Sequence, residues 1–222
     1  MSGRDVILGR VRRALADVTP DVTPDGTPYE AALPRDYLRE HGERSLARTV
    51  ELLAENLADY RALVHRCAGV PELSALIAGL LAGRGARSVL VPPGLDGAWL
   101  ADTGAEVTRV ADEAASTAAE LDRVDSVVTG CAVAVAETGT LVLDGSPDQG
   151  RRRITLIPDH HICVVRVPEQ VVGSVPQAVA RLDPRRPLTW ISGPSATSDI
   201  ELNRVEGVHG PRTLEVVLLG GA

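Results

Sequence analysis

A regular alternation of short aliphatic strands with helices runs through the middle of the chain. We expect strands at 60–65, 88–91, 106–110 and 126–128, and helices at 43–58, 71–81, 96–101 and 111–121. Strands that alternate with helices at about this spacing are typical of βαβ units, whose strands run parallel. The sequence therefore predicts an α/β fold built on a mostly parallel sheet.

The second half of the chain changes character. Three strand candidates, Thr140–Leu143, Arg153–Ile157 and Ile162–Val167, follow one another with short turns, which predicts an antiparallel or mixed section. A helix is expected at Glu169–Leu182, and the last strands at Leu188–Ile191 and Thr213–Leu218. The 222 residues include no Phe, so Val, Leu, Ile and Ala must form the core.

The amino-terminal region has a different pattern. Residues 4–16 predict a short amphipathic helix, and the Pro, Thr and Asp residues of 19–28 predict a linker without periodic structure. We therefore divide the chain into an amino-terminal helical arm with a linker, residues 1–35, and an α/β domain, residues 36–222.

Charge and cysteine usage exclude several classes of function. The formal net charge of −7 argues against a nucleic-acid partner. No apolar run is long enough for a transmembrane segment, and the amino terminus has no signal-peptide pattern, so the expected compartment is the cytoplasm. The three cysteines are far apart and form no CxxC pair, so we expect no bound metal and no iron–sulfur cluster in this chain.

Two polar segments stand out between apolar strands. Glu137–Thr140 reads Glu-Thr-Gly-Thr, where the glycine permits close approach of a ligand; an ordinary β-turn explains the same pattern. The loop 145–150 leads into Arg151, Arg152 and Arg153, whose guanidinium groups suit a carboxylate or a phosphate. A solvated charged loop is the alternative, and residues that alternate along a strand cannot all face one ligand.

Two more polar segments lie near the carboxyl terminus. Residues 192–201 follow a strand, and ligands collect at the carboxyl ends of strands in open α/β sheets. A capped loop is the alternative there. His209 stands between glycines as a candidate acid, base or anion donor, or as part of a turn. His160 and His161 are adjacent in a strand and point apart, which argues against a shared metal.

These segments together resemble one known family. The runs AETGTLVLD (136–144), QGRRRITLIPDHH (149–161) and ISGPSATSDIELNRVEGVHGPRTLEVVLL (191–219) are similar to those of the LUD domain family, and most closely to its lactate utilization protein C group. The resemblance is strong over about 120–222 and looser before that. Ser198 departs from the family pattern, since Ala is more usual there, and Arg153 stands where smaller residues are common.

The resemblance implies a three-layer α/β/α domain with a mixed, mostly parallel sheet, like those of the NagB/RpiA/CoA-transferase-like superfamily. It implies a role in oxidising L-lactate to pyruvate, as the component without a cluster beside iron–sulfur partner subunits. The expected ligand is a small anion such as lactate, pyruvate or a phosphate-like group. The oligomeric state is left open, and a homo-oligomer is one of the options.

The residue patterns and the family resemblance together give the expected site. Glu137, Asp199 and His209 are the candidate catalytic residues. The candidate ligand-binding residues are Thr138, Gly139, Thr140, Arg151, Arg152, Gly193, Ser195, Thr197 and Glu201. Two other hypotheses stay open at this stage. One is a CoA-transferase-like or other small-anion-binding enzyme with Glu137 at its site, and the other is a ligand-binding or regulatory module.

Overall fold

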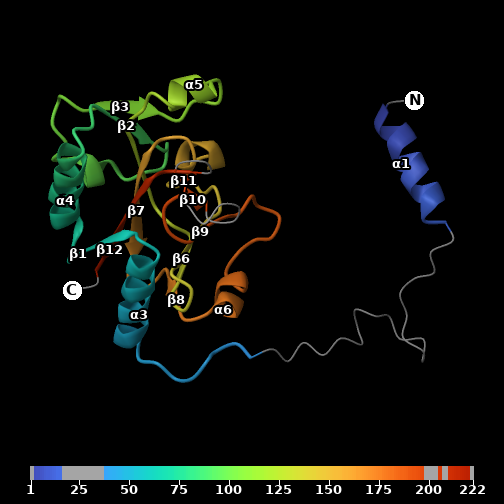
Figure 1. Ribbon diagram of the computed structural model, residues 1–222, viewed down its shortest axis with the longest axis horizontal. Helices are drawn as coiled ribbons and strands as arrows, with labels where there is room; N and C mark the ends of the chain where they lie inside the picture. Colours follow the sequence, from blue (N-terminus) through green and yellow to red (C-terminus); the bar gives the residue numbers. More distant parts are fainter. Residues whose placement is uncertain (1–2, 17–37, 198–204, 207–209, 221–222) are drawn as a thin grey trace. The chain divides into compact units, whose positions relative to one another are not determined.

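The computed structural model describes residues 3–16, 38–197, 205–206 and 210–220 (Figure 1). Contacts within the chain divide it into two units, Met1–Leu38 and Arg39–Ala222. In the first unit, helix α1 spans Gly3–Ala14, which confirms the helix predicted at 4–16. The linker predicted after it lies outside the described residues.

The second unit is built on a six-stranded sheet in which every neighbouring pair is parallel. Its strand order is β1-β12-β7-β4-β2-β3. The strands are β1 (Leu63–Cys67), β2 (Ser88–Val91), β3 (Thr108–Ala111), β4 (Ser126–Thr129), β7 (His160–Arg166) and β12 (Thr213–Leu219). The predicted α/β fold with a mostly parallel sheet is thereby confirmed. The longest strands, β7 and β12, lie together near the centre and carry the buried aliphatic core.

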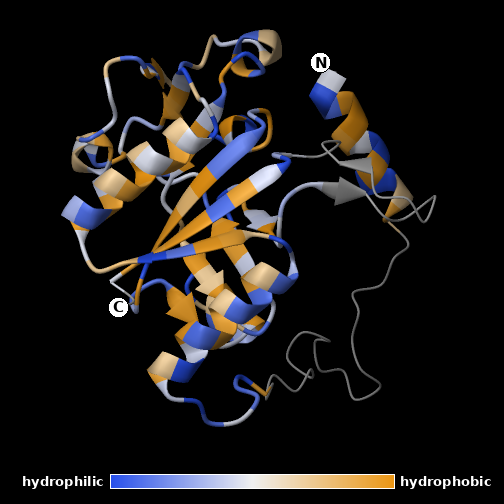
Figure 2. Ribbon diagram, turned by 60° about the vertical axis from the view of Figure 1, so that its left-hand side comes forward, coloured by the Kyte–Doolittle hydropathy of each residue, from blue (hydrophilic) through white to orange (hydrophobic). Residues whose placement is uncertain are grey.

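Side chains that alternate along β7 and β12 pack against different layers. Helix α4 (Val70–Gly83) and the 3₁₀ helix η1 (Gly97–Leu100) cover one face, where α4 packs on the side of Ile162 and Val164. Helix α3 (Leu46–Asp59) covers the other face through its apolar stripe, on the side of Cys163 and Val165. Figure 2 shows the hydrophobic strands between these helices.

A second, four-stranded sheet lies on the same face as α3. Its order is β8-β5-β6-β9, from strands β5 (Val133–Val135), β6 (Thr140–Leu143), β8 (Val171–Val172) and β9 (Thr189–Ile191). The β5–β6 and β6–β9 pairs are antiparallel and the β5–β8 pair is parallel. This sheet confirms the mixed section predicted in the second half, although β7 belongs to the parallel sheet.

Three predicted elements are wrong in type or length. The strand expected at Arg153–Ile157 is the 3₁₀ helix η2 (Arg152–Thr155), which buries Ile154 among aliphatic side chains under β2 and β4. The helix expected at 111–121 is reduced to α5 (Ala118–Leu121), which starts at the capping box of Thr117 and Glu120. The helix expected at 169–182 is reduced to α6 (Val175–Val179), because Val171–Val172 pair as strand β8.

Four short strands of the described residues were not predicted. They are β5 and β8, whose apolar runs are only three and two residues long, and the separate antiparallel pair β10 (Ala196–Thr197) and β11 (Val205–Glu206). Within the described ranges, no helix has both the length and the apolar character needed to cross a lipid bilayer.

Candidate functional site

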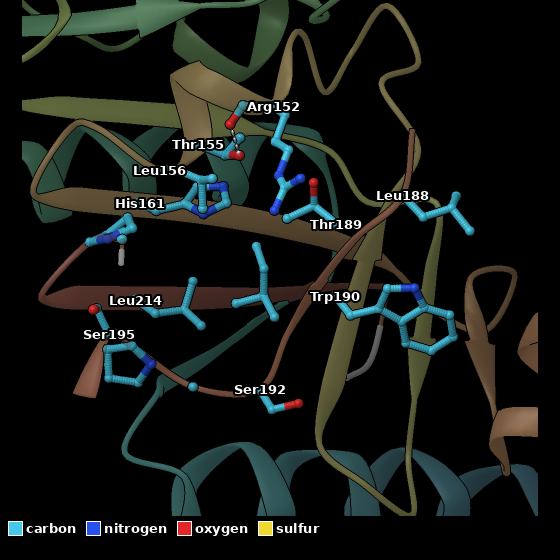
Figure 3. A pocket seen from close by; sticks show the side chains of 15 residues that line it. Arg152, Thr155, Leu156, His161, Leu188, Thr189, Trp190, Ser192, Ser195 and Leu214 are labelled. Atoms are coloured by element: carbon cyan, nitrogen blue, oxygen red, sulfur yellow. Dashed lines mark hydrogen bonds between the residues drawn. The ribbon is translucent and has the colours of Figure 1, made fainter. Parts of the chain in front are cut away.

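A cavity of about 400 Å³ opens where the two sheets meet (Figure 3). Its walls come from η2, from the amino-terminal ends of β7 and β12, and from β9 with the residues that follow it. The cavity therefore lies at the carboxyl end of β9, as the sequence suggested for the segment after Ile191. With respect to the central parallel strands, however, the cavity lies at their amino ends. Ligand sites in open α/β sheets usually lie at the carboxyl ends of these strands.

His161 supplies the most deeply buried polar group of the cavity. Its ring is fully buried, and its Nε2 atom lies 2.8 Å from the Oγ1 atom of Thr129 on β4. Its Nδ1 atom has no hydrogen-bond partner in the described structure. Burial, with a smaller contribution from the adjacent His160, lowers the pKa of His161 to about 3. The imidazole is therefore neutral near pH 7, and its free nitrogen suits a polar ligand atom.

Arg152 supplies the positive charge of the cavity. Figure 3 shows its side chain extending from η2 into the space between η2 and β9. Its guanidinium makes no ion pair or hydrogen bond with any residue that the structure describes. A second, smaller cavity of about 180 Å³ is also lined by Arg152, together with Thr155 and Thr189 of the first. An unpaired guanidinium at this junction favours an anionic ligand.

The segment after β9 provides one wall of the cavity. Ser192, Gly193 and Ser195 line it, and the Ser195 amide donates to the carbonyl oxygen of Pro211 at 2.8 Å. Gly193 has a φ of +84°, and a β-carbon there would collide with the carbonyl oxygen of Tyr60. The glycine is thus required by backbone packing, and it lets the segment turn toward the cavity.

The Glu-Thr-Gly-Thr segment is the turn between β5 and β6, and Glu137 lies in a different, small polar cavity. Arg44 donates to its carboxylate at 2.7 Å, and His41 lies 2.8 Å from it. Burial acts to raise the pKa of Glu137, but these two contacts outweigh it and lower the pKa below its usual value. Glu137 is therefore an ion-paired carboxylate, and its catalytic role, including the CoA-transferase-like one, stays a prediction.

The other residues of this turn have contacts of their own. The hydroxyl group of Thr140 lies 2.8 Å from those of both Thr138 and Ser192, which joins the turn to the cavity wall through one hydroxyl chain. Gly139 has a φ of +55°, and a β-carbon there would lie 2.7 Å from the carbonyl carbon of Asn56 on α3. The glycine therefore allows the turn to pack against α3.

Arg151 points away from the large cavity, although it is next to Arg152 in sequence. Its Nε donates to the buried carboxylate of Asp112 at 2.8 Å, and its guanidinium also donates to backbone carbonyls of Glu113 and Ala114. Asp112 raises the pKa of Arg151 further. The two arginines, expected to act as a pair, both line the smaller cavity, but only Arg152 lines the large one, while Arg151 is bound to Asp112.

Several expected site residues cannot be placed. Asp199, Glu201 and His209 lie outside the described residues, and of Thr197 only the backbone in β10 is described. In sequence they fall between Ser195 and Gly210, which both line the cavity. Their predicted roles stay predictions.

Sequence reasoning missed His161, which lines the cavity, and Thr129, which contacts the His161 ring from β4. The signal was present, since each is a polar residue inside an otherwise apolar buried strand. His160 and His161 were considered only as a metal pair, and they do point to opposite faces of the sheet. Across the described ranges, no cluster of three or more His, Cys, Asp or Glu side chains could hold a metal ion.

Comparison with known proteins gives one consistent family. The model of the LUD domain matches residues 50–219, which include every residue named above as lining the large cavity. Lactate utilization protein C of Deinococcus radiodurans is 49% identical over 180 residues, covering 79% of this chain and 82% of that protein. Lactate utilization protein C of Bacillus subtilis is 32% identical over 128 residues, covering 54% and 49% of the two chains.

A solved structure is similar as well. The crystal structure of a DUF162 family protein from Deinococcus radiodurans superposes with a TM-score of 0.65 and 44% sequence identity. The match covers 80% of this chain and all of that one. The fold and the sequence therefore point to the same family.

Proposed function

Because this chain belongs to the LUD domain family, we propose that it acts in lactate utilization and binds a small 2-hydroxy or 2-oxo acid, such as L-lactate or pyruvate. The proposal places the acid in the cavity between η2, β7 and β9. The observation that carries it is the pairing, in one cavity, of the Arg152 cation, which forms no ion pair with the residues that the structure describes, with the buried His161 Nδ1, which has no hydrogen-bond partner there.

These two side chains match the two polar ends of such an acid. The guanidinium of Arg152 binds the carboxylate, for which its planar fork is suited. His161 then meets the oxygen on the second carbon through Nδ1. If the Thr129 hydroxyl donates to Nε2, the proton of the neutral ring is on Nδ1, and His161 is a hydrogen-bond donor. A ring with so low a pKa is a poor base, so His161 orients the substrate.

The proposal extends to the assembly. Oxidation of L-lactate to pyruvate releases two electrons and two protons, and this chain has no cysteine cluster that could hold an iron–sulfur centre. We propose that iron–sulfur partner subunits accept the electrons while this chain supplies the substrate site. Cys67, Cys131 and Cys163 are unpaired and buried, which supports a reducing compartment such as the cytoplasm.

Two finer assignments belong to the same proposal. One is membership of the NagB/RpiA/CoA-transferase-like superfamily, which the parallel sheet between helical layers supports. The other is the division into an arm and linker, 1–35, and a LUD-type domain, 36–222, which is close to the division between Leu38 and Arg39 found from contacts.

Growth on L-lactate tests this role. In a strain of the source organism that lacks this chain, we expect no growth on L-lactate as the carbon source, and normal growth on pyruvate. The wild-type chain and the Arg185→Gln variant should restore growth, since Arg185 is exposed, pairs with Asp183 and does not line the cavity. Arg152→Gln should not restore it. Full growth of the deletion strain on L-lactate would rule the proposal out.

A further inference from the structure

The size of the cavity bears on which acid it holds. Its volume is about 400 Å³, within the range of about 300–1,000 Å³ that is typical of sites for drug-sized ligands. A three-carbon acid bound between Arg152 and His161 would leave much of this space without a partner. Space of this kind beside a bound ligand is normally filled by a further part of the ligand or by water.

The chemistry of the remaining walls favours a further part of the ligand. Apolar residues line the cavity from three segments: Leu156 after η2, Ile191 and Pro194 around the end of β9, and Pro211 and Leu214 at the start of β12. Leu214 is buried in the main core, and Ile191 packs partly against that core. Thr155, Thr189, Ser192 and Ser195 also line the cavity and can hold ordered water on their side, whereas the aliphatic walls offer water no partner and offer an apolar chain a place to be buried.

The alternation of side chains along β9 shows which of its residues face this space. Trp190 pairs with Val142, whose side chain lies in the cluster on the α6 side of the small sheet. Ile191 pairs with Leu141, which lies in the core on the opposite side. Figure 3 agrees, since the Trp190 ring extends away from His161 and Leu214. Trp190 also lines the cavity, but its ring extends away from His161 and Leu214, so the apolar wall beside these two residues is aliphatic, from Ile191 and Leu214.

We infer that the preferred ligand is a 2-hydroxy or 2-oxo acid with a branched aliphatic chain, larger than lactate. This inference rests on the proposed function, because it keeps the carboxylate on Arg152 and the 2-oxygen on His161. It adds that the chain of the acid lies against Leu156, Ile191 and Leu214. Lactate itself is then a small member of the class that the site accepts.

Calorimetry with a matched pair of acids tests the inference. The probes are L-lactate and L-2-hydroxyisocaproate, which share the 2-hydroxy acid group and differ by an isopropyl group. Burial of three more carbons should tighten binding about 10- to 100-fold. In Ile191→Phe, the new ring fills part of the cavity. The affinity for L-2-hydroxyisocaproate should then exceed that for L-lactate by less than about threefold. Val179→Phe, the matching change on the exposed face of α6, should leave the ratio unchanged.

Each result has a definite meaning. If the longer acid binds no more tightly than L-lactate, the inference is wrong and the proposed function stands. If the longer acid binds and L-lactate does not, the inference stands and the assignment to lactate is wrong. If neither binds, both are wrong. The ratio of the two affinities is informative in folded Ile191→Phe, or in Leu156→Phe if the first variant does not fold. If that ratio is unchanged, the aliphatic part of the acid does not lie against this wall, which contradicts the inference.

Discussion

The Nε2 atom of His161 lies 2.8 Å from the Oγ1 atom of Thr129, across two neighbouring parallel strands. This contact holds the imidazole by one nitrogen and leaves the other, Nδ1, without a partner in the described structure at the base of the cavity. Thr129 is thus a positioning residue for His161. The hydrogen bond sets which nitrogen carries the proton and so what the ring offers to a ligand.

Removal of the Thr129 hydroxyl tests this positioning. Thr129→Val keeps the shape of the side chain and leaves His161 Nε2 unpaired, so we expect a loss of about 1–3 kcal/mol in the free energy of unfolding. Pyruvate affinity should fall as well, because the ring loses its fixed tautomer. Thr129→Ser keeps the hydroxyl and should retain most of both properties. Equal behaviour of the Val and Ser variants, by urea denaturation and calorimetry, would contradict the role of the hydroxyl.

The buried neutral ring also predicts how stability depends on pH. His161 has a pKa of about 3 in the folded chain and near 6.5 when unfolded. Between these values the unfolded chain binds a proton that the folded chain does not. The free energy of unfolding should therefore fall as the pH drops below 6.5, by about 1.4 kcal/mol per pH unit at most.

Urea denaturation at pH 7, 6 and 5 measures this effect. The informative quantity is the slope of the free energy of unfolding against pH, compared between the wild type and His161→Gln. The variant has no imidazole at this position, and all other groups contribute equally to both proteins. We expect a shallower decline in the variant, whatever its absolute stability. Parallel curves over this range would show that His161 is not buried in its neutral form.

The arrangement of the fold was predictable where one short pattern decides it. The apolar residues 88–91 and 140–143 predicted β2 and β6 with the bounds that the structure has. Two helices were overestimated because apolar composition does not show where a tertiary contact ends a helix. At the first of them, the carboxylate of Asp112 binds Arg151, and this holds the chain in a loop.

The site was predictable in part. Arg152, Gly193 and Ser195 were named from sequence and do line one cavity. Glu137 and Arg151 were grouped with them because their segments match motifs of the same family, but their partners His41, Arg44 and Asp112 come from distant segments. Such partners follow from the packing of the two sheets, which one sequence does not reveal.

The two adjacent arginines should respond differently to the same substitution. Arg151→Gln removes charge-assisted hydrogen bonds to Asp112 and should lower the free energy of unfolding by about 1–3 kcal/mol, with little change in pyruvate affinity. Arg152→Gln removes an unpaired side chain and should leave stability within about 0.5 kcal/mol. Its cost should instead be in affinity. The reverse pattern, measured by denaturation and calorimetry, would exchange the two roles.

A buried polar chain on the α4 face of the parallel sheet predicts an acid-sensitive element. His65 Nε2 lies 2.5 Å from one carboxylate oxygen of Glu215, and His160 Nε2 lies 3.7 Å from the other. His160 Nδ1 lies 2.8 Å from the hydroxyl group of Ser126. Burial acts to raise the pKa of Glu215, but the contacts with His160 and His65 outweigh it and lower the pKa.

Because the folded pKa of Glu215 is below its unfolded value near 4.5, this carboxylate stabilises the fold above pH 4.5. The contribution is lost as the pH falls through the folded pKa. At pH 7, Glu215→Gln should lower the free energy of unfolding by about 1–3 kcal/mol. Glu55→Gln, which breaks an exposed and solvent-screened ion pair with Arg48, should cost clearly less than Glu215→Gln. Similar losses in both variants would show that the buried contacts of Glu215 with His65 and His160 stabilise the fold no more than an exposed ion pair does.

The most direct test of the central claim is the affinity of the chain for pyruvate, measured by calorimetry in the wild type and in Arg152→Gln. The account predicts one site per chain in the wild type and a loss of affinity of about tenfold or more in the variant, because a charge-assisted contact is worth about 1.5–3 kcal/mol. Arg185→Gln should bind as the wild type does. Pyruvate binding that is equally strong in Arg152→Gln, or absent from the wild type, would contradict the account.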